Sequence, residues 1–132
     1  MKNPILITPV KDSLKTTSQI IHSLRAENQE IPYYIFDDFS SRETRRWLEI
    51  NASKYNYNIV SLAQFVKKSS PNYRATLILA RKMALENDAN LAIVESDVYA
   101  TPSIILELNK LAEELSEAGL VGAVTVNHSG EI

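Results

Sequence analysis

YYIFDDFSS, residues 33–41, is the stretch that decides the fold. Its first four residues are apolar or aromatic and predict a buried β-strand, and two aspartates follow directly. A second stretch, LAIVESD at residues 91–97, repeats the pattern with two acids that lie two positions apart. In open α/β sheets, ligands bind at the carboxyl ends of the strands. The sequence therefore predicts a sheet edge that carries carboxylates from two strands.

Apolar runs alternate with helix-period segments along the whole chain, which is typical of βαβ units. We therefore expect a three-layer α/β/α domain with a mainly parallel sheet of about five strands. Pro9 should end the first strand, because proline cannot donate to a central ladder. The expected strands cover residues 4–10, 31–36, 57–62, 91–94 and 120–126, and the expected helices begin near residues 13, 40, 73 and 102 and end near residues 28, 50, 86 and 119.

The composition is that of an ordinary globular protein, and residues 1–132 form a single domain without a linker. The chain has 132 residues, 45% of them apolar and 23% charged, and its formal net charge of −2 gives no case for nucleic-acid binding. The absence of cysteine excludes thiolate zinc sites and cysteine nucleophiles. No segment has the length of a membrane span or the pattern of a signal peptide, so we expect a cytoplasmic protein.

Asp37 and Asp38 are adjacent, so their side chains should leave the strand in different directions. One is expected to face the crevice at the sheet edge, while the other orients the loop or caps the next helix. Ser40 and Glu43 have capping-box spacing, which predicts a helix start at Ser40. The aspartates can equally be turn and N-cap residues, since Asp and Ser favour such positions. Both interpretations stay open on these residues alone.

Glu95 and Asp97 should project to the same side of an extended chain, where they could share a hard divalent cation. The other interpretation is a polar loop at the end of a strand. The chain has neither a G-x-G-x-x-G nor a G-x-x-x-x-G-K-[ST] motif, and all three glycines lie after residue 118. If phosphates bind here, a metal and Arg or Lys must hold them in place of a glycine-rich loop.

Taken in order, these motifs form a set. The chain carries Pro9-Val10-Lys11-Asp12 after the first strand, Asp37-Asp38-Phe39-Ser40 after the second, Arg74 at a helix start, and Glu95-Ser96-Asp97 with Pro102 five residues on. The set resembles the N-terminal, nucleotide-sugar-binding half of a family 2 glycosyltransferase with the GT-A fold, whose corresponding motifs are P-x-Y-N, D-D-G-S and D-x-D. The resemblance covers nearly the whole chain.

The resemblance implies a metal-assisted transfer of a sugar from a nucleotide-diphosphate-sugar to an unspecified acceptor. Mn²⁺ or Mg²⁺ is the implied cofactor, and a UDP-sugar is favoured over a GDP-sugar as donor. Pro9 and Lys11 would line the base pocket, and Asp38 would hydrogen-bond the base or its ribose. The implied nucleotide-binding residues are Pro9, Lys11, Asp37, Asp38, Arg74 and Ser96, and the implied metal ligands are Asp97 and Glu95.

Three positions depart from the family motifs. Lys11 replaces an aromatic residue, so base stacking there is lost or becomes a cation contact. Phe39 replaces a glycine, which disfavours a loop geometry that needs a positive φ. Glu95 replaces the first aspartate of the metal motif, and its longer side chain must reposition to touch a cation.

No residue is assigned as a catalytic base, because the second acidic motif of the family lies well beyond the metal motif and nothing around Glu131 suggests one. We expect the chain to be the truncated donor-binding part of a longer enzyme that lies peripherally at the inner membrane surface. Unpaired strand edges predict homo-oligomers.

The alternative function is a non-catalytic α/β domain that binds a nucleotide or a partner. A phosphate-accepting receiver domain fits less well, because residues 60–62 offer no aspartate.

Overall fold

A computed structural model describes residues 1–132 and shows strands and helices alternating along the chain. The predicted α/β class is confirmed. The strands are β1 (Pro4–Val10), β2 (Tyr33–Asp37), β3 (Asn58–Ser61) and β4 (Asn90–Ile93). The helices are α1 (Leu14–Arg25), α2 (Arg42–Tyr55), the 3₁₀ turn η1 (Leu62–Gln64), α3 (Tyr73–Glu86) and α4 (Pro102–Glu114).

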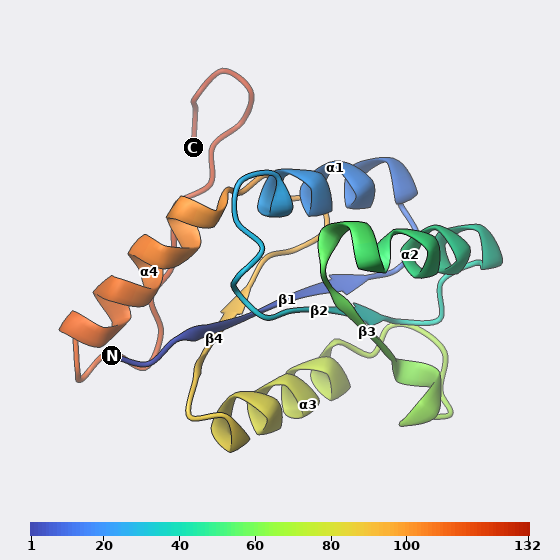
Figure 1. The fold of residues 1–132 in the computed structure, drawn as a ribbon, viewed down its shortest axis with the longest axis horizontal. Coiled ribbons are helices and arrows are strands. Elements are labelled where there is room, and N and C mark those ends of the chain that lie inside the picture. The colour runs from blue at the N-terminus through green and yellow to red at the C-terminus, as the bar shows by residue number, and fades with distance from the viewer.

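The four strands form one parallel sheet in the order β3-β2-β1-β4. β1 is therefore central, with β2 on one side and β4 on the other. Helices α1, α2 and α4 lie over one face of the sheet and α3 lies over the other, which gives three layers (Figure 1). Both faces are covered, as parallel sheets require.

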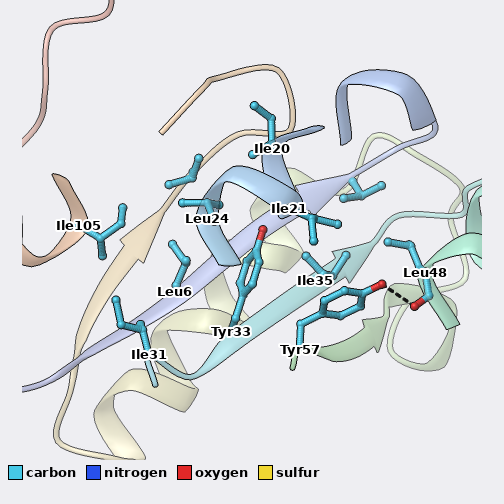
Figure 2. Packing of buried hydrophobic residues seen from close by; sticks show 12 residues of the cluster. Leu6, Ile20, Ile21, Leu24, Ile31, Tyr33, Ile35, Leu48, Tyr57 and Ile105 are labelled. Atoms are coloured by element: carbon cyan, nitrogen blue, oxygen red, sulfur yellow. Dashed lines mark hydrogen bonds between the residues drawn. The ribbon is translucent and has the colours of Figure 1, made fainter. Parts of the chain in front are cut away.

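The core is divided by the sheet into two clusters, because successive side chains of a strand point to opposite faces. Leu6 and Val10 of β1 belong to the cluster beneath α1, α2 and α4, whereas Ile5 and Ile7 belong to the cluster beneath α3. Figure 2 shows the first cluster, in which the Tyr57 hydroxyl donates a hydrogen bond to the Leu48 carbonyl. This packing fixes the sheet and with it the strand ends that carry the acids.

β1 runs through Pro9 to Val10, so the expectation that Pro9 ends the strand is wrong. The Ile7 carbonyl accepts from Val94, while the Val10 carbonyl accepts from Asp38, so alternate residues of β1 turn their backbone groups to β4 and to β2. Pro9 therefore faces the β4 side. Pairing with β4 has already ended there at Ile7, and the missing N–H costs no ladder bond.

Two predicted helix boundaries need correction. α2 begins at Arg42 with Ser41 as its N-cap, so Ser40 and Glu43 do not form the predicted capping box. α4 begins as expected, with Thr101 as N-cap and proline at its first position, but it ends at Glu114, before the expected stop near residue 119.

The fifth strand predicted at residues 120–126 is absent, and the sheet has four strands. Leu120 is 91% exposed and Val124 71% exposed, and the segment follows α4 without pairing to a strand. Strand propensity alone does not form a strand, because the ladder partner and the buried face supply the stability. This apolar segment has neither.

Arg25 forms a buried polar corner at the C-terminus of α1. Only 2% of the residue is exposed, and its guanidinium donates to the carbonyls of Asn28, Ile31 and Asn56 while lying 4.9 Å from the Tyr33 ring centre. These contacts tie α1 to the start of β2 and to the end of α2. We call this set the Arg25 corner.

Each helix falls short of the length and apolar content that a membrane crossing requires.

Candidate functional site

The candidate site lies at the carboxyl ends of β1, β2 and β4. The chain leaves β1 toward β2 and β3 on one side, while β4 adds on the other side, so the order of strands reverses between β1 and β4. Such a switch point opens a crevice that binds ligands in α/β sheets. Ile7 and Ile93 form the last β1–β4 register pair, and Pro9 lies just beyond it.

Asp37 and Asp38 are both buried at this edge, 2% and 8% exposed. The Asp37 carboxylate accepts from the Ser40 backbone N–H at 3.2 Å, and so holds its own loop. The two Asp38 oxygens accept from the backbone N–H and the side-chain amide of Asn72, both at 2.8 Å. Since an ionised carboxylate has about four acceptor positions, Asp38 keeps acceptor capacity.

Glu95 accepts a hydrogen bond from the residue that follows Asn72. The Tyr73 hydroxyl donates to a Glu95 carboxylate oxygen at 2.7 Å, and this hydrogen bond, with partial burial, raises the pKa of Tyr73 to about 12. Asn72 and Tyr73 are consecutive, so the start of α3 contacts the acidic stretches of both β2 and β4. We call these two residues the α3 bridge. The bridge brings Asp38 and Glu95 to one edge of the sheet, as the sequence predicted.

The remaining candidates on this edge are less constrained. Asp97 is exposed and makes no hydrogen bond or ion pair within the chain. Arg74 follows the α3 bridge and is also exposed and unpaired, while Ser96 is half-buried in the turn after β4. We call Asp37, Asp38, Glu95 and Asp97 together the acidic edge.

Asp12 is a residue of this site to which sequence reasoning gave no role. Its carboxylate oxygen Oδ1 accepts from the Ser41 backbone N–H at 2.7 Å and from the Thr44 hydroxyl at 3.1 Å. Its own N–H donates to the Ser40 hydroxyl at 2.9 Å. The bonds that the Asp12 carboxylate accepts, first from Ser41 and then from Thr44, lower its pKa to about 2. Asp12 therefore caps α2 from another loop, where the helix dipole also favours a negative charge.

Lys11 reinforces the same junction. Its ammonium lies 3.4 Å from an Asp12 carboxylate oxygen and donates to the Phe39 carbonyl. The β1–α1 loop, which carries Lys11, is thereby fastened to the β2–α2 loop, which carries Asp38. The sequence signal that could have revealed the role of Asp12 is its place in a tight turn just before a helix, where Asp tolerates left-handed backbone.

Left-handed backbone is concentrated in these loops. Asp12 and Ser13 have φ values of 55° and 50°, and Phe39 has a φ of 57°. The loop therefore adopts the positive φ that we expected Phe39 to prevent, at the backbone cost that a glycine would avoid. The Phe39 ring packs against the core cluster beneath α3, and that contact offsets the backbone strain.

The acidic side chains of this edge suit an open cation site and do not form a closed one. No group of three or more His, Asp or Glu side chains lies close enough together to enclose a metal ion. Mg²⁺-type ions, however, are commonly held by one or two carboxylates together with substrate phosphates. The exposed, unpaired Asp97 with Glu95 two residues earlier fits such a shared ion, and does not fit a closed protein cage.

Comparison with known proteins identifies the fold and no family. No family model matches the chain, and no curated protein does. Among solved structures, the chain is similar to S. aureus TarS, a glycosyltransferase. TarS 1–349 in complex with UDP-GlcNAc matches with a TM-score of 0.58 and 21% identity over 86% of this chain and 32% of that chain.

Two further TarS structures give the same result. The longer TarS structure matches with a TM-score of 0.58 and 21% identity over 86% of this chain and 20% of that chain, and TarS 1–349 with UDP matches with a TM-score of 0.50 and 18% identity over 86% of this chain and 32% of that one. The chain thus spans about a third or less of the TarS chains it matches. It has a glycosyltransferase-like α/β fold.

Proposed function

We propose that this chain is the donor-binding part of a glycosyltransferase that uses a UDP-sugar. The observation that carries the proposal is the α3 bridge, through which two acidic strand ends lie together at the switch point of a parallel sheet. The fold likeness supports it, because TarS has been crystallised with UDP-GlcNAc and with UDP. GDP-sugars are the less favoured donors, and the family 2, GT-A assignment belongs to the same proposal.

The nucleotide would lie over the ends of β1 and β2. Pro9 and the stem of Lys11 line the base pocket, and Asp38 accepts a hydrogen bond from the base or ribose with the acceptor capacity that Asn72 leaves free. Asp37 acts indirectly by holding the loop through Ser40. The buried position of Asp38 makes its acceptor geometry rigid, which favours one orientation of the nucleoside.

The diphosphate would lie between β4 and the start of α3. Arg74 and Ser96 donate to its oxygens, and Asp97 with Glu95 holds Mn²⁺ or Mg²⁺. When bound, such a cation stabilises the negative charge of a departing diphosphate. The Tyr73 hydroxyl donates to only one of the two Glu95 oxygens, so the other oxygen is free to contribute to such a cation.

Calorimetry tests this proposal. UDP and GDP are titrated into the chain with and without Mn²⁺, and we expect UDP to bind more tightly when the metal is present. Asp97→Asn should weaken the metal-dependent binding by about tenfold, the effect of losing one charged ligand. Asp88→Asn is the matched control, because Asp88 is an exposed aspartate remote from the acidic edge and paired only with Lys2.

A non-catalytic binding domain is the second candidate. It is favoured by one observation, namely that both Asp38 oxygens already have partners within the chain. Nucleotide binding that does not respond to metal, with equal affinity in Asp97→Asn and the parent chain, would support this reading. The absence of any nucleotide binding would exclude the donor site in either form.

A further inference from the structure

A concavity of about 770 Å³ lies over α1, and its lining shares no residue with the acidic edge, although Tyr99 follows Asp97 by two positions. Helix α1 contacts both α2 and α4 (Figure 1). Residues of α1 and of the turn that follows it line the concavity. Trp47 and Tyr55 of α2 complete the lining, together with Tyr99 and Thr101 before α4 and Pro102 at its first position. We call this concavity the α1 groove.

The aromatic lining of the α1 groove is held in place. Trp47 stacks on Tyr55 at 6.3 Å between ring centres with an angle of 25°. His22 meets Tyr55 edge-on at 5.9 Å, and its Nδ1 lies 3.3 Å from the Tyr55 hydroxyl. Each ring limits the movement of the next, so little order has to be gained when a ligand binds. Tyr99 adds a ring that is 74% exposed.

The polar lining offers hydrogen bonds and almost no charge. The side chains of Gln19 and Glu27 make no hydrogen bond within the chain, and His22 keeps its second ring nitrogen free. Ser23 donates to the Ala100 carbonyl at 2.9 Å, which fixes the segment before α4 against α1. Glu27 is the only Asp, Glu, Lys or Arg side chain in the lining. The lining holds no Lys or Arg side chain that could pair with a phosphate.

Aromatic rings beside free amide, imidazole and carboxylate groups suit a ligand with flat C–H faces and many hydroxyls. A cation is the competing ligand, since rings and a carboxylate also attract positive charge. Lys54, however, already lies 5.1 Å from the Tyr55 ring centre, and its charge would repel a second cation there. The lining thus favours a neutral polyol.

We propose that the α1 groove binds a neutral saccharide, separately from the nucleotide. The exposed face of Tyr99 stacks on a sugar ring, and Gln19, Glu27 and the free nitrogen of His22 bond its hydroxyls. The inference needs only the geometry of the groove and holds whether or not the acidic edge binds a donor.

Trp47 is the only tryptophan of the chain, so its fluorescence reports on the groove directly. The test titrates the whole chain with cellotriose, maltotriose and chitotriose. We expect a saturable change with at least one of them. Tyr99→Ala should weaken that binding about three- to tenfold, the worth of one stacked ring. Phe65→Ala, which removes a 56% exposed ring outside the groove lining, should leave the affinity unchanged.

The proposal is overturned if no trisaccharide gives a saturable change, or if Tyr99→Ala binds as tightly as the parent chain. A response to tetramethylammonium with none to the sugars would also overturn it and assign a cation site. The nucleotide titrations are read separately, by calorimetry. Saccharide binding without UDP binding would leave this inference standing while the donor proposal fails, and the reverse result would do the opposite.

Discussion

The Arg25 corner lies where β2 begins, and the acidic edge lies where β2 and β4 end. Both contain a charged side chain that is buried. At the Arg25 corner, one cation is almost fully enclosed and is bonded to three backbone carbonyls. At the acidic edge, Asp38 is buried and bonded to Asn72, whereas Asp97 and Arg74 are exposed and unpaired. An enclosed charge with only internal partners is structural, whereas a partly open group of charges can exchange its partners for a ligand.

The largest effect should come from breaking the Arg25 corner. Arg25→Met keeps much of the side-chain volume but leaves the carbonyls of Ile31 and Asn56 without their buried donor. We expect the free energy of unfolding to fall by about 3 kcal/mol. Urea unfolding followed by circular dichroism measures the change.

Arg45→Met is the control for this variant, because Arg45 is exposed on α2. It should change the free energy of unfolding by less than about 0.5 kcal/mol. If Arg25→Met lost no more than this control, the corner would not be the structural element that the comparison requires.

A smaller effect is expected at the junction beside the acidic edge. Asp12→Ala removes the acceptor for Ser41 and Thr44 at the start of α2 and also places an alanine at a φ of 55°, so it should lower the free energy of unfolding by about 1–2 kcal/mol. Asp12→Asn keeps an oxygen at that position and should lose less. Equal losses in the two variants would show that charge, and not hydrogen bonding, stabilises the junction.

The difference in stability between the parent chain and Asp12→Ala should depend on pH, with a sign set by the pKa of Asp12. The pKa of Asp12 is lowered from its usual value of 3.8 to about 2, so the folded state favours the ionised form. The resulting stability is fully present above pH 3.8 and is lost as the pH falls through 2. The difference between the parent chain and Asp12→Ala should therefore shrink over this range in urea titrations.

The smallest effect should separate backbone strain from packing at Phe39. Phe39→Ala and Phe39→Gly both remove the ring, but only glycine adopts a φ of 57° without a Cβ penalty. The glycine variant should therefore be more stable than the alanine variant by about 1 kcal/mol. The opposite order in thermal unfolding would mean that the loop relaxes to a negative φ once the ring is removed.

Sequence patterns predicted the parts of this molecule that depend on local periodicity. All four strands and all four α-helices occur where alternating apolar runs placed them, because one or two buried faces leave a period in the sequence. The acids at 37, 38, 95 and 97 were found for a related reason, since each pair follows an apolar run directly. The nucleotide and metal roles given to them remain predictions.

The parts that sequence reasoning missed depend on partners far along the chain. Asp12 is defined by bonds to Ser41 and Thr44, which lie about thirty residues away, and its sequence context shows only a turn. Residues 120–126 have strand composition, but a strand also needs a neighbour, which composition cannot reveal. Phe39 adopts left-handed backbone because its ring packs in the core, a contact that no local rule contains.

Pro9 has a consequence that reaches beyond its own residue. Adjacent parallel strands can continue to pair for as long as both supply backbone N–H donors and carbonyl acceptors. Because the imide nitrogen at position 9 cannot donate, it prevents one further hydrogen bond between β1 and β4, just past the pair formed by Ile7 and Ile93. The proline ring thus ends the pairing of β1 with β4 at the carboxyl edge of the sheet, where the proposed ligand would enter.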